Sequence, residues 1–264
     1  MTEPLRRDGR RHDRKYYLPG GKEVETKEEA MALIGLRCGH LLRKLRLSPH
    51  VVSASLGFDL FKYCNEKGTS SHGEYGILRE IFRRLAISKG VLCEFGAWDG
   101  IRYSNTYNLI TQHGWTGVLM EADAERYVRL AWNAEAWPGI RTYDTLIHYD
   151  PTQGTLLDDF FDTVQMPKDF DLLSIDIDSF DYQVWDSLQR YSPKVVVIEA
   201  DDLDLEIIQD PAIKHANLGG STCFPPMKRL GESKGYTLVA YTGNLIFVRN
   251  DLVDVVKDWR KEQS

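Results

Sequence analysis

The sequence is poor in cysteine and contains no long apolar run. Its 264 residues include four cysteines, Cys38, Cys64, Cys93 and Cys223, whose wide and irregular spacing fits neither a zinc site nor a disulfide framework. No apolar stretch approaches the roughly 20 residues that a membrane-spanning helix needs, and the N-terminus shows no apolar core of a secretory signal. These absences predict a cytoplasmic protein that does not enter a membrane and whose cysteines are buried thiols.

Acidic residues outnumber basic ones, 39 to 33. The formal net charge is −6, which argues against nucleic acid as a partner, because nucleic-acid binding depends on a surplus of Lys and Arg. The one basic cluster, from Arg6 to Lys15, is short and is interrupted by Asp8 and Asp13. We therefore predict that residues 1–25 form a disordered basic tail.

Helical and strand-like patterns divide the rest of the chain. Two stretches between residues 26 and 90 place apolar residues at helical spacing, which predicts an N-terminal helical cap over residues 26–90. From residue 91 onward, short apolar runs alternate with helical stretches. This alternation predicts a second unit over residues 91–256, in which helices cover both faces of a mainly parallel sheet.

The composition of the apolar runs makes that expectation more specific. "GVLCEF", "GVLM" and "KVVVIE" are apolar almost throughout, as is typical of parallel strands that are buried on both faces. A closing pair of strands, in "YTLVAYTGNLIFVRND", is joined by a tight turn at Thr242-Gly243-Asn244, so these two strands must be antiparallel. We therefore predict an α/β, Rossmann-like class I methyltransferase fold with a terminal antiparallel hairpin and an N-terminal helical extension. Unrelated functions share Rossmann-like sheets, so the fold alone does not settle the activity.

The chain lacks the G-x-G-x-x-G pattern of nicotinamide-binding enzymes at the end of its first predicted strand. The sequence there is "CEFGAWDG", with Glu94 before Gly96 and Gly100 and with Trp98 between the glycines. Acids at this point would repel a pyrophosphate. S-adenosylmethionine carries a sulfonium and an ammonium but no phosphate. The stretch matches the E-x-G-x-G-x-G pattern of enzymes that bind this cofactor at three of four positions. The sequence therefore predicts S-adenosylmethionine as the cofactor.

A second acid supports the same cofactor. Glu121 ends the next predicted strand, where an acid can accept both hydroxyls of a ribose. The competing interpretation is that Glu94 caps a turn and that Glu121 is a surface acid. The residues expected to bind the cofactor are Glu94, Gly96, Ala97, Trp98, Gly100, Glu121, Ala122 and Asp176.

Further acids follow the two next parallel strands. We expect a divalent ion, Mg²⁺ before Ca²⁺, because like charges this close repel one another unless a cation offsets them. Such an ion could lower the pKa of an acceptor hydroxyl. The alternative is that these acids cap backbone turns or are solvated. The predicted metal ligands are Asp176, Asp178, Glu199 and Asp201.

Methyl transfer to a hydroxyl benefits from a general base. The candidates are Asp178, His148 after the third predicted strand, and His215 after the fifth. Each histidine could equally be a structural or surface residue.

Several short segments, taken in order, resemble the FkbM-like group of S-adenosylmethionine-dependent methyltransferases. The resemblance covers roughly residues 70 to 250 and implies that Glu94, Gly96 and Gly100 line the methionine part of the cofactor, with Glu121 at the ribose. "SHGEYG" resembles the segment S-Q-x-G-E-D-G of that group, with His72 in place of the glutamine. The matching segments are "SHGEYGILREIF", "CEFGAWDG", "SNTYNLI", "GWTGVLMEAD", "DLLSIDIDSFDYQVW", "KVVVIEAD" and "KGYTLV".

Together these features predict an S-adenosylmethionine-dependent O-methyltransferase whose partner is a small metabolite or sugar-like acceptor. A homodimer is compatible with the sequence, which does not fix the oligomeric state. Two alternatives stay open. Trp98 at a glycine position favours a methyltransferase-fold binding or scaffold subunit without catalysis, and the missing G-x-G-x-x-G disfavours a nicotinamide-dependent oxidoreductase.

Overall fold

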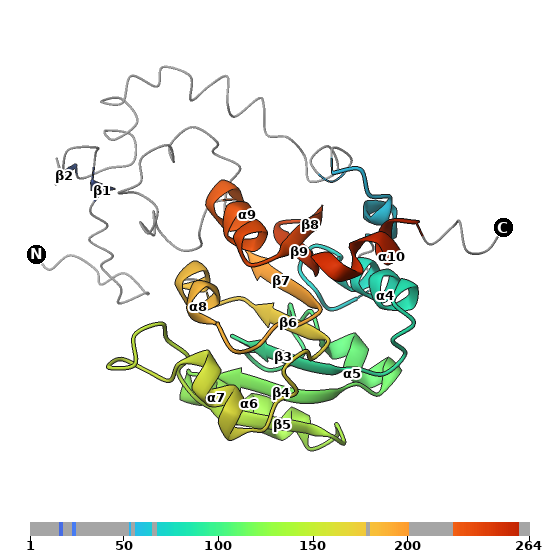
Figure 1. Ribbon diagram of the computed structural model, residues 1–264. Helices are drawn as coiled ribbons and strands as arrows, with labels where there is room; N and C mark the ends of the chain where they lie inside the picture. The colour runs from blue at the N-terminus through green and yellow to red at the C-terminus, as the bar shows by residue number, and fades with distance from the viewer. Residues whose placement is uncertain are drawn as a thin grey trace, which may run out of the picture.

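The computed structural model describes residues 16–17, 23–24, 53, 56–64, 68–177, 180–200 and 224–258. Its centre is a seven-stranded sheet with the strand order β5-β4-β3-β6-β7-β9-β8 (Figure 1). The strands are β3 (Val91–Phe95), β4 (Thr116–Glu121), β5 (Ile140–Asp144), β6 (Leu172–Ile175), β7 (Val195–Glu199), β8 (Tyr236–Tyr241) and β9 (Asn244–Arg249).

The strand directions confirm the predicted fold. Strands β3 to β7 pair in parallel, while β9 is antiparallel to both β7 and β8. The chain adds β4 and β5 on one side of β3 and then crosses to add β6 and β7 on the other. This is the Rossmann-like class I methyltransferase arrangement, and the reversal of strand order between β3 and β6 makes the crevice in which α/β sheets bind ligands.

Helices cover both faces of this sheet, as the alternation of patterns predicts (Figure 1). One face carries α4, α5 and α10 and the other α7, α8 and α9, while α6 packs against β4 and β5. The helices are α4 (Glu74–Arg84), α5 (Tyr107–His113), α6 (Ala124–Ala134), α7 (Leu157–Thr163), α8 (Asp181–Ser187), α9 (Phe224–Ser233) and α10 (Val253–Asp258), with 3-10 turns η1 (Leu60–Tyr63) and η3 (Asn250–Leu252).

Side-chain alternation along the strands divides the apolar core into two layers. In β3, Cys93 packs with the α7–α9 layer and Leu92 with the α4–α5 layer. Residues two apart on a strand share a face, so Glu94 points to the side of Leu92. The same count places Glu121 on the side of Leu119, which also belongs to the α4–α5 layer. Glu199 follows Val197 in the same way, so three strand-end acids share one face of the sheet.

The predicted N-terminal units are described only in part. Within the predicted tail, β1 (Tyr16–Tyr17) pairs with β2 (Glu23–Val24) in an antiparallel two-stranded sheet. Within the predicted cap, the described helix α4 lies on the main sheet, where its buried Ile77, Leu78 and Ile81 join the α4–α5 layer. The other parts of both units lie outside the described residues.

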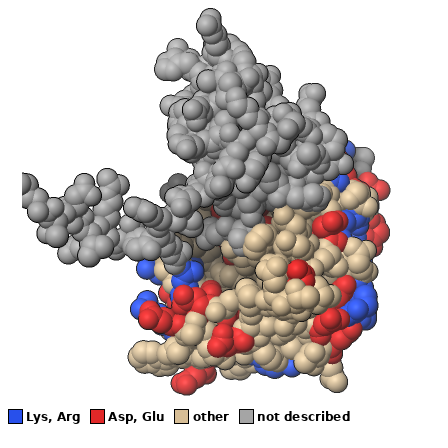
Figure 2. Space-filling view, turned by 90° about the vertical axis from the view of Figure 1, so that its left-hand side faces the viewer, with Lys and Arg blue, Asp and Glu red and all other residues tan. Residues whose placement is uncertain are grey.

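The distribution of charged side chains and the character of the helices can be compared with the expectations from composition. On the face seen in Figure 2, acidic and basic side chains are interspersed around an area of uncharged residues, so the described part of this face carries no extended field of one sign. Within the described ranges, no helix combines the length and the apolar character that crossing a bilayer requires.

Gly96 brings the ends of β3 and β6 together at the crevice. Its φ is +73°, and a Cβ added there would lie 1.7 Å from the Asp176 carbonyl oxygen. A side chain at this position would therefore meet both a strained backbone conformation and a backbone atom that cannot move without shifting β6. Gly235 is a natural reference, because its φ is +83° and nothing lies within 4 Å of an added Cβ.

We expect Gly235→Ala to lower the free energy of unfolding by about 1–2 kcal/mol, the cost of a left-handed conformation with a Cβ. Gly96→Ala should cost about 1–3 kcal/mol more, because overpacking adds to the same backbone strain. Urea unfolding of both variants measures the difference. Equal losses in the two variants would show that the close approach of β3 and β6 is not rigid.

Candidate functional site

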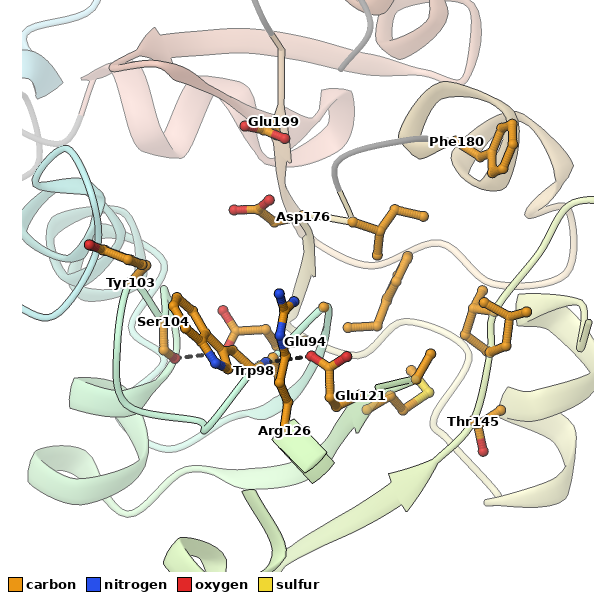
Figure 3. A pocket seen from close by; sticks show the side chains of 18 of the residues that line it. Glu94, Trp98, Tyr103, Ser104, Glu121, Arg126, Thr145, Asp176, Phe180 and Glu199 are labelled. Carbon is orange, nitrogen blue, oxygen red and sulfur yellow. Dashed lines mark hydrogen bonds between the residues drawn. The ribbon is translucent and has the colours of Figure 1, made fainter. Parts of the chain in front are cut away.

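A pocket of about 600 Å³ opens at the carboxyl ends of the parallel strands. Residues that follow β3, β4, β5 and β6 line it, together with Glu199 at the end of β7. Figure 3 shows Trp98 and Tyr103 on one side and Thr145 and Phe180 on the other, with Glu94 and Glu121 between them. Its volume lies in the range of small-molecule and cofactor sites, and its position is the crevice that the sheet topology predicts.

The turn after β3 forms one wall of the pocket and is wound in the left-handed region. Gly96, Trp98 and Gly100 have φ values of 73°, 50° and 76°. Ala97 N–H donates to the Met120 carbonyl at 3.0 Å, which ties the turn to β4. Trp98 therefore adopts the conformation that a glycine would adopt at this position, while its side chain lines the pocket.

Glu94 is buried at the base of this turn and is surrounded by donors. Its Oε2 accepts hydrogen bonds from the hydroxyls of Ser104 and Thr106, each at 2.7 Å. Its Oε1 accepts from Asn105 N–H at 2.9 Å and from the Ser174 hydroxyl at 3.3 Å. Burial raises the pKa of the Glu94 carboxyl, and these four donors work against that rise. The side chain both lines the pocket and fixes the backbone of residues 104–106.

Glu121 joins the turn to the next helix and faces the same pocket (Figure 3). Its Oε2 accepts from Trp98 N–H at 2.8 Å, and its Oε1 accepts from Asp123 N–H at 2.9 Å. Asp123 in turn caps α6 by accepting from Arg126 N–H. Each carboxylate oxygen can accept two hydrogen bonds, so Glu121 keeps acceptor capacity for a ligand. Gly96, Ala97 and Ala122 also line the pocket, whereas Gly100 packs behind the turn against Leu130 and Trp137.

His148 lies on the wall that follows β5, the edge strand on this side of the sheet. Its Nδ1 accepts a hydrogen bond from Asp150 N–H at 3.0 Å. The ring stacks on Tyr149, with centroids 4.5 Å apart, and meets Phe180 edge-on at 5.0 Å. The side chain is thus part of an aromatic wall that includes Phe180, from the segment between β6 and α8.

The predicted acidic cluster is described only in part. Asp176 and Glu199 both line the pocket (Figure 3), whereas Asp178, Asp201 and His215 lie outside the described residues. Strand β6 ends at Ile175, so Asp176 is the first residue beyond the strand. Among the residues described, no group of three or more His, Cys, Asp or Glu side chains could hold a metal ion.

A histidine that the sequence analysis did not select lies near Glu199. His72 Nδ1 is 3.6 Å from Oε1 of Glu74, which is completely buried, while the His72 side chain is 55% exposed. Glu74 also accepts from the Thr242 hydroxyl at 2.6 Å and from the Asn244 amide at 3.2 Å. Because β9 begins at Asn244, opposite Glu199, this pair is anchored at the end of β7.

The electrostatics of this pair follow from its surroundings. The Glu74 carboxylate raises the pKa of His72, against the effect of partial burial, and Glu199 adds to the rise. Burial alone would raise the pKa of Glu74, but the contacts with His72 and Thr242 hold it below its usual value. The sequence signal was the departure of His72 from the FkbM-like segment, which gave no indication of the partner.

We expect NMR titration to place the pKa of His72 above 6.5, with Glu74→Gln bringing it back toward that value. Since the pKa is raised by folding, protonated His72 stabilises the fold below about pH 6.5. That contribution is lost as the pH rises through the pKa of the folded state. His72→Gln should therefore lower the melting temperature more at pH 5.5 than at pH 8.5, and an equal loss at both values would contradict the ion pair.

Comparisons with known proteins concern the fold. No protein-family model and no curated protein matches the sequence. Solved structures that match include a protein from Galdieria sulphuraria described as a sarcosine dimethylglycine methyltransferase, with 14% identity and a TM-score of 0.39 over 61% of this chain. This chain spans 60% of the length of that protein.

Two further matches are similar in strength. The M. capricolum TrmK structure, which contains S-adenosyl-homocysteine, has 11% identity and a TM-score of 0.38 over 64% of this chain and 68% of its own. The METTL16 methyltransferase domain has 11% identity and a TM-score of 0.44 over 90% of this chain and 86% of its own. At these identities the likeness is one of fold, so the activity has to be argued from the pocket itself.

Proposed function

We propose that this protein is an S-adenosylmethionine-dependent methyltransferase. The observation that carries the proposal is the hydrogen bond of Glu121 to the left-handed turn after β3, beside an exposed glycine backbone at the switch point of the sheet, where its carboxylate would accept the hydroxyls of a ribose. A nicotinamide cofactor would instead need a glycine-rich turn that leaves room for a pyrophosphate. Here the middle position carries the bulky Trp98.

The order of strands suggests how the cofactor would lie. With the ribose at Glu121, one end of the cofactor would extend toward the wall after β5, where Thr145, Ile147 and His148 line the pocket. The apolar and aromatic character of that wall suits adenine. The other end would extend toward Gly96 and Asp176, where acids suit the ammonium and sulfonium groups. The cofactor supplies an activated methyl group, and the protein has to hold an acceptor in line with it.

This orientation changes the assignment of the base. His148 would stand at the adenine end, so it is a poor candidate for taking a proton from the acceptor. His72 is a further candidate: it does not itself line the pocket, but Glu74 orients its Nδ1, and its exposed ring lies near Glu199, which does line it. Asp178 and His215 remain predictions of the same role. An oxygen acceptor on a small metabolite fits this arrangement, and kinship with the FkbM-like group remains part of the proposal.

A metal is a weaker part of the proposal. The two acids that face the pocket from β6 and β7, Asp176 and Glu199, are fewer than the oxygen ligands that Mg²⁺ or Ca²⁺ usually takes from protein and water together. Asp178 and Asp201 would have to complete the set. No step of methyl transfer is therefore assigned to a metal ion.

One observation favours a second candidate, a binding subunit without catalysis. The indole of Trp98 stands in the pocket where a glycine would leave space for the cofactor. If the side chain stays in place, it would compete with the cofactor. Binding of the cofactor itself therefore distinguishes the two candidates.

We expect calorimetry to detect binding of S-adenosylmethionine and S-adenosylhomocysteine but not of NAD. Glu121→Ala should weaken both by about tenfold to a hundredfold, because charge-assisted hydrogen bonds contribute about 1.5–3 kcal/mol. The affinity of Glu121→Gln for both ligands should lie between those of Glu121→Ala and the wild type. Glu125→Ala is the matched control, since it removes the same charge from an exposed position in the first turn of α6.

Three outcomes separate the candidates. Binding of NAD alone would contradict the proposal and point to an oxidoreductase. Absence of all binding in a folded protein would favour the non-catalytic subunit. Equal losses in Glu121→Ala and Glu125→Ala would remove Glu121 from the cofactor site.

A further inference from the structure

Two arginines stand at the pocket and share one aromatic ring. Arg102 lies in the loop before α5 and Arg126 in the first turn of α6, and both line the pocket. Their guanidinium carbons lie 5.0 Å and 5.2 Å from the ring centroid of Trp98. The two guanidinium groups are therefore at most about 10 Å apart. Figure 3 shows Arg126 pointing up into the pocket beside Trp98.

Neither guanidinium group has an acidic partner among the residues that the structure describes; each contacts aromatic rings only. Two acids that lie close to these arginines in the sequence are already engaged by backbone donors. Asp99 accepts from the N–H groups of Ile101 and Arg102, and Asp123 accepts from that of Arg126. Arg84 differs from them, because it is paired with both Asp59 and Glu80.

The backbone is strained at two aromatic residues that contact these arginines. Trp98 and Tyr103 have φ values of 50° and 61°, and a left-handed conformation costs a non-glycine residue roughly 1–2 kcal/mol. Tyr103 is 54% exposed, and its ring lies 5.9 Å from that of Trp98. Strain of this kind is typical of functional sites, where surrounding contacts hold residues in place for binding.

We propose that Arg102 and Arg126 form an anion site that binds a phosphate or carboxylate group of the acceptor at the mouth of the pocket. Guanidinium groups bind such oxyanions through paired N–H donors. Both guanidinium groups lie against the Trp98 ring, which restrains the two side chains, so less side-chain entropy is lost on binding. The nearby carboxylates of Glu94 and Glu121 are hydrogen-bonded to donors within the pocket. The anion would bind farther out than these two carboxylates.

That the anion belongs to a methyl acceptor rests on the proposed function, whereas the anion site itself does not. The cofactor also has a carboxylate, so the same arginines could bind the cofactor instead of the acceptor. Inorganic phosphate and acetate are suitable probes, because each is an anion without the rest of a substrate. Trp98 is a suitable reporter, because its indole N–H signal can be identified among those of six tryptophans by comparison with Trp98→Phe.

We expect the Trp98 indole signal to shift saturably when phosphate is added at constant ionic strength, with a dissociation constant on the order of 1–10 mM. Acetate should cause a smaller shift in the same direction. Arg102→Gln and Arg126→Gln should each weaken phosphate binding about tenfold, and the double variant should show no saturable shift. Arg129→Gln is the matched control, since Arg129 is exposed on α6 and does not line the pocket.

The experiment is then repeated with saturating S-adenosylhomocysteine. If phosphate still binds, the arginines are available to the acceptor, as proposed. If S-adenosylhomocysteine abolishes phosphate binding, the cofactor's carboxylate occupies the site and the acceptor assignment is overturned. No saturable shift in the wild type, or an equal loss in Arg129→Gln, overturns the anion site. Phosphate binding without any binding of S-adenosylhomocysteine supports the anion site and contradicts the proposed methyltransferase.

Discussion

The buried carboxylate of Glu94 holds together the segments on which the rest of the pocket depends. It gathers Ser104, Asn105 and Thr106 around the end of β3, and it receives Ser174 from β6. The loop that carries Arg102 and Tyr103 is therefore fixed between the left-handed turn and residues 104–106. A buried carboxylate with several donors restricts the backbone strongly. If the carboxylate were removed, each donor would lose its acceptor, and water could not replace it there.

Glu121 performs the corresponding task one strand away. It connects the turn after β3 to the start of α6 through two backbone N–H groups, so a ligand bound to its carboxylate would be coupled to both elements. The strict alternation of side chains explains why Glu94, Glu121 and Glu199 can reach one pocket, since each lies two residues beyond an apolar residue of the same core layer. Packing of the core thus determines which acids face the ligand.

Much of this arrangement could be predicted from the sequence because it depends on local patterns. Apolar runs gave the parallel strands, and the tight turn at Gly243 gave the antiparallel hairpin. The partners of Glu94 could not be predicted, because Ser174 is 80 positions away in the chain and comes close only when β6 pairs with β3. The same holds for Glu74, which contacts Thr242 and Asn244 only through the fold.

The distribution of charge within the pocket could not be predicted from the composition. A net charge of −6 suggests an acidic protein, and the floor of the pocket is indeed acidic, with Glu94 and Glu121 between the walls. Arg102 and Arg126, however, place positive charge at Trp98, in front of that floor. A ligand that carries cationic groups at one end and an anionic group at the other would be oriented by this separation. The turn after β3 links the two regions, because Trp98 donates its N–H to Glu121 and presents its ring to the two arginines.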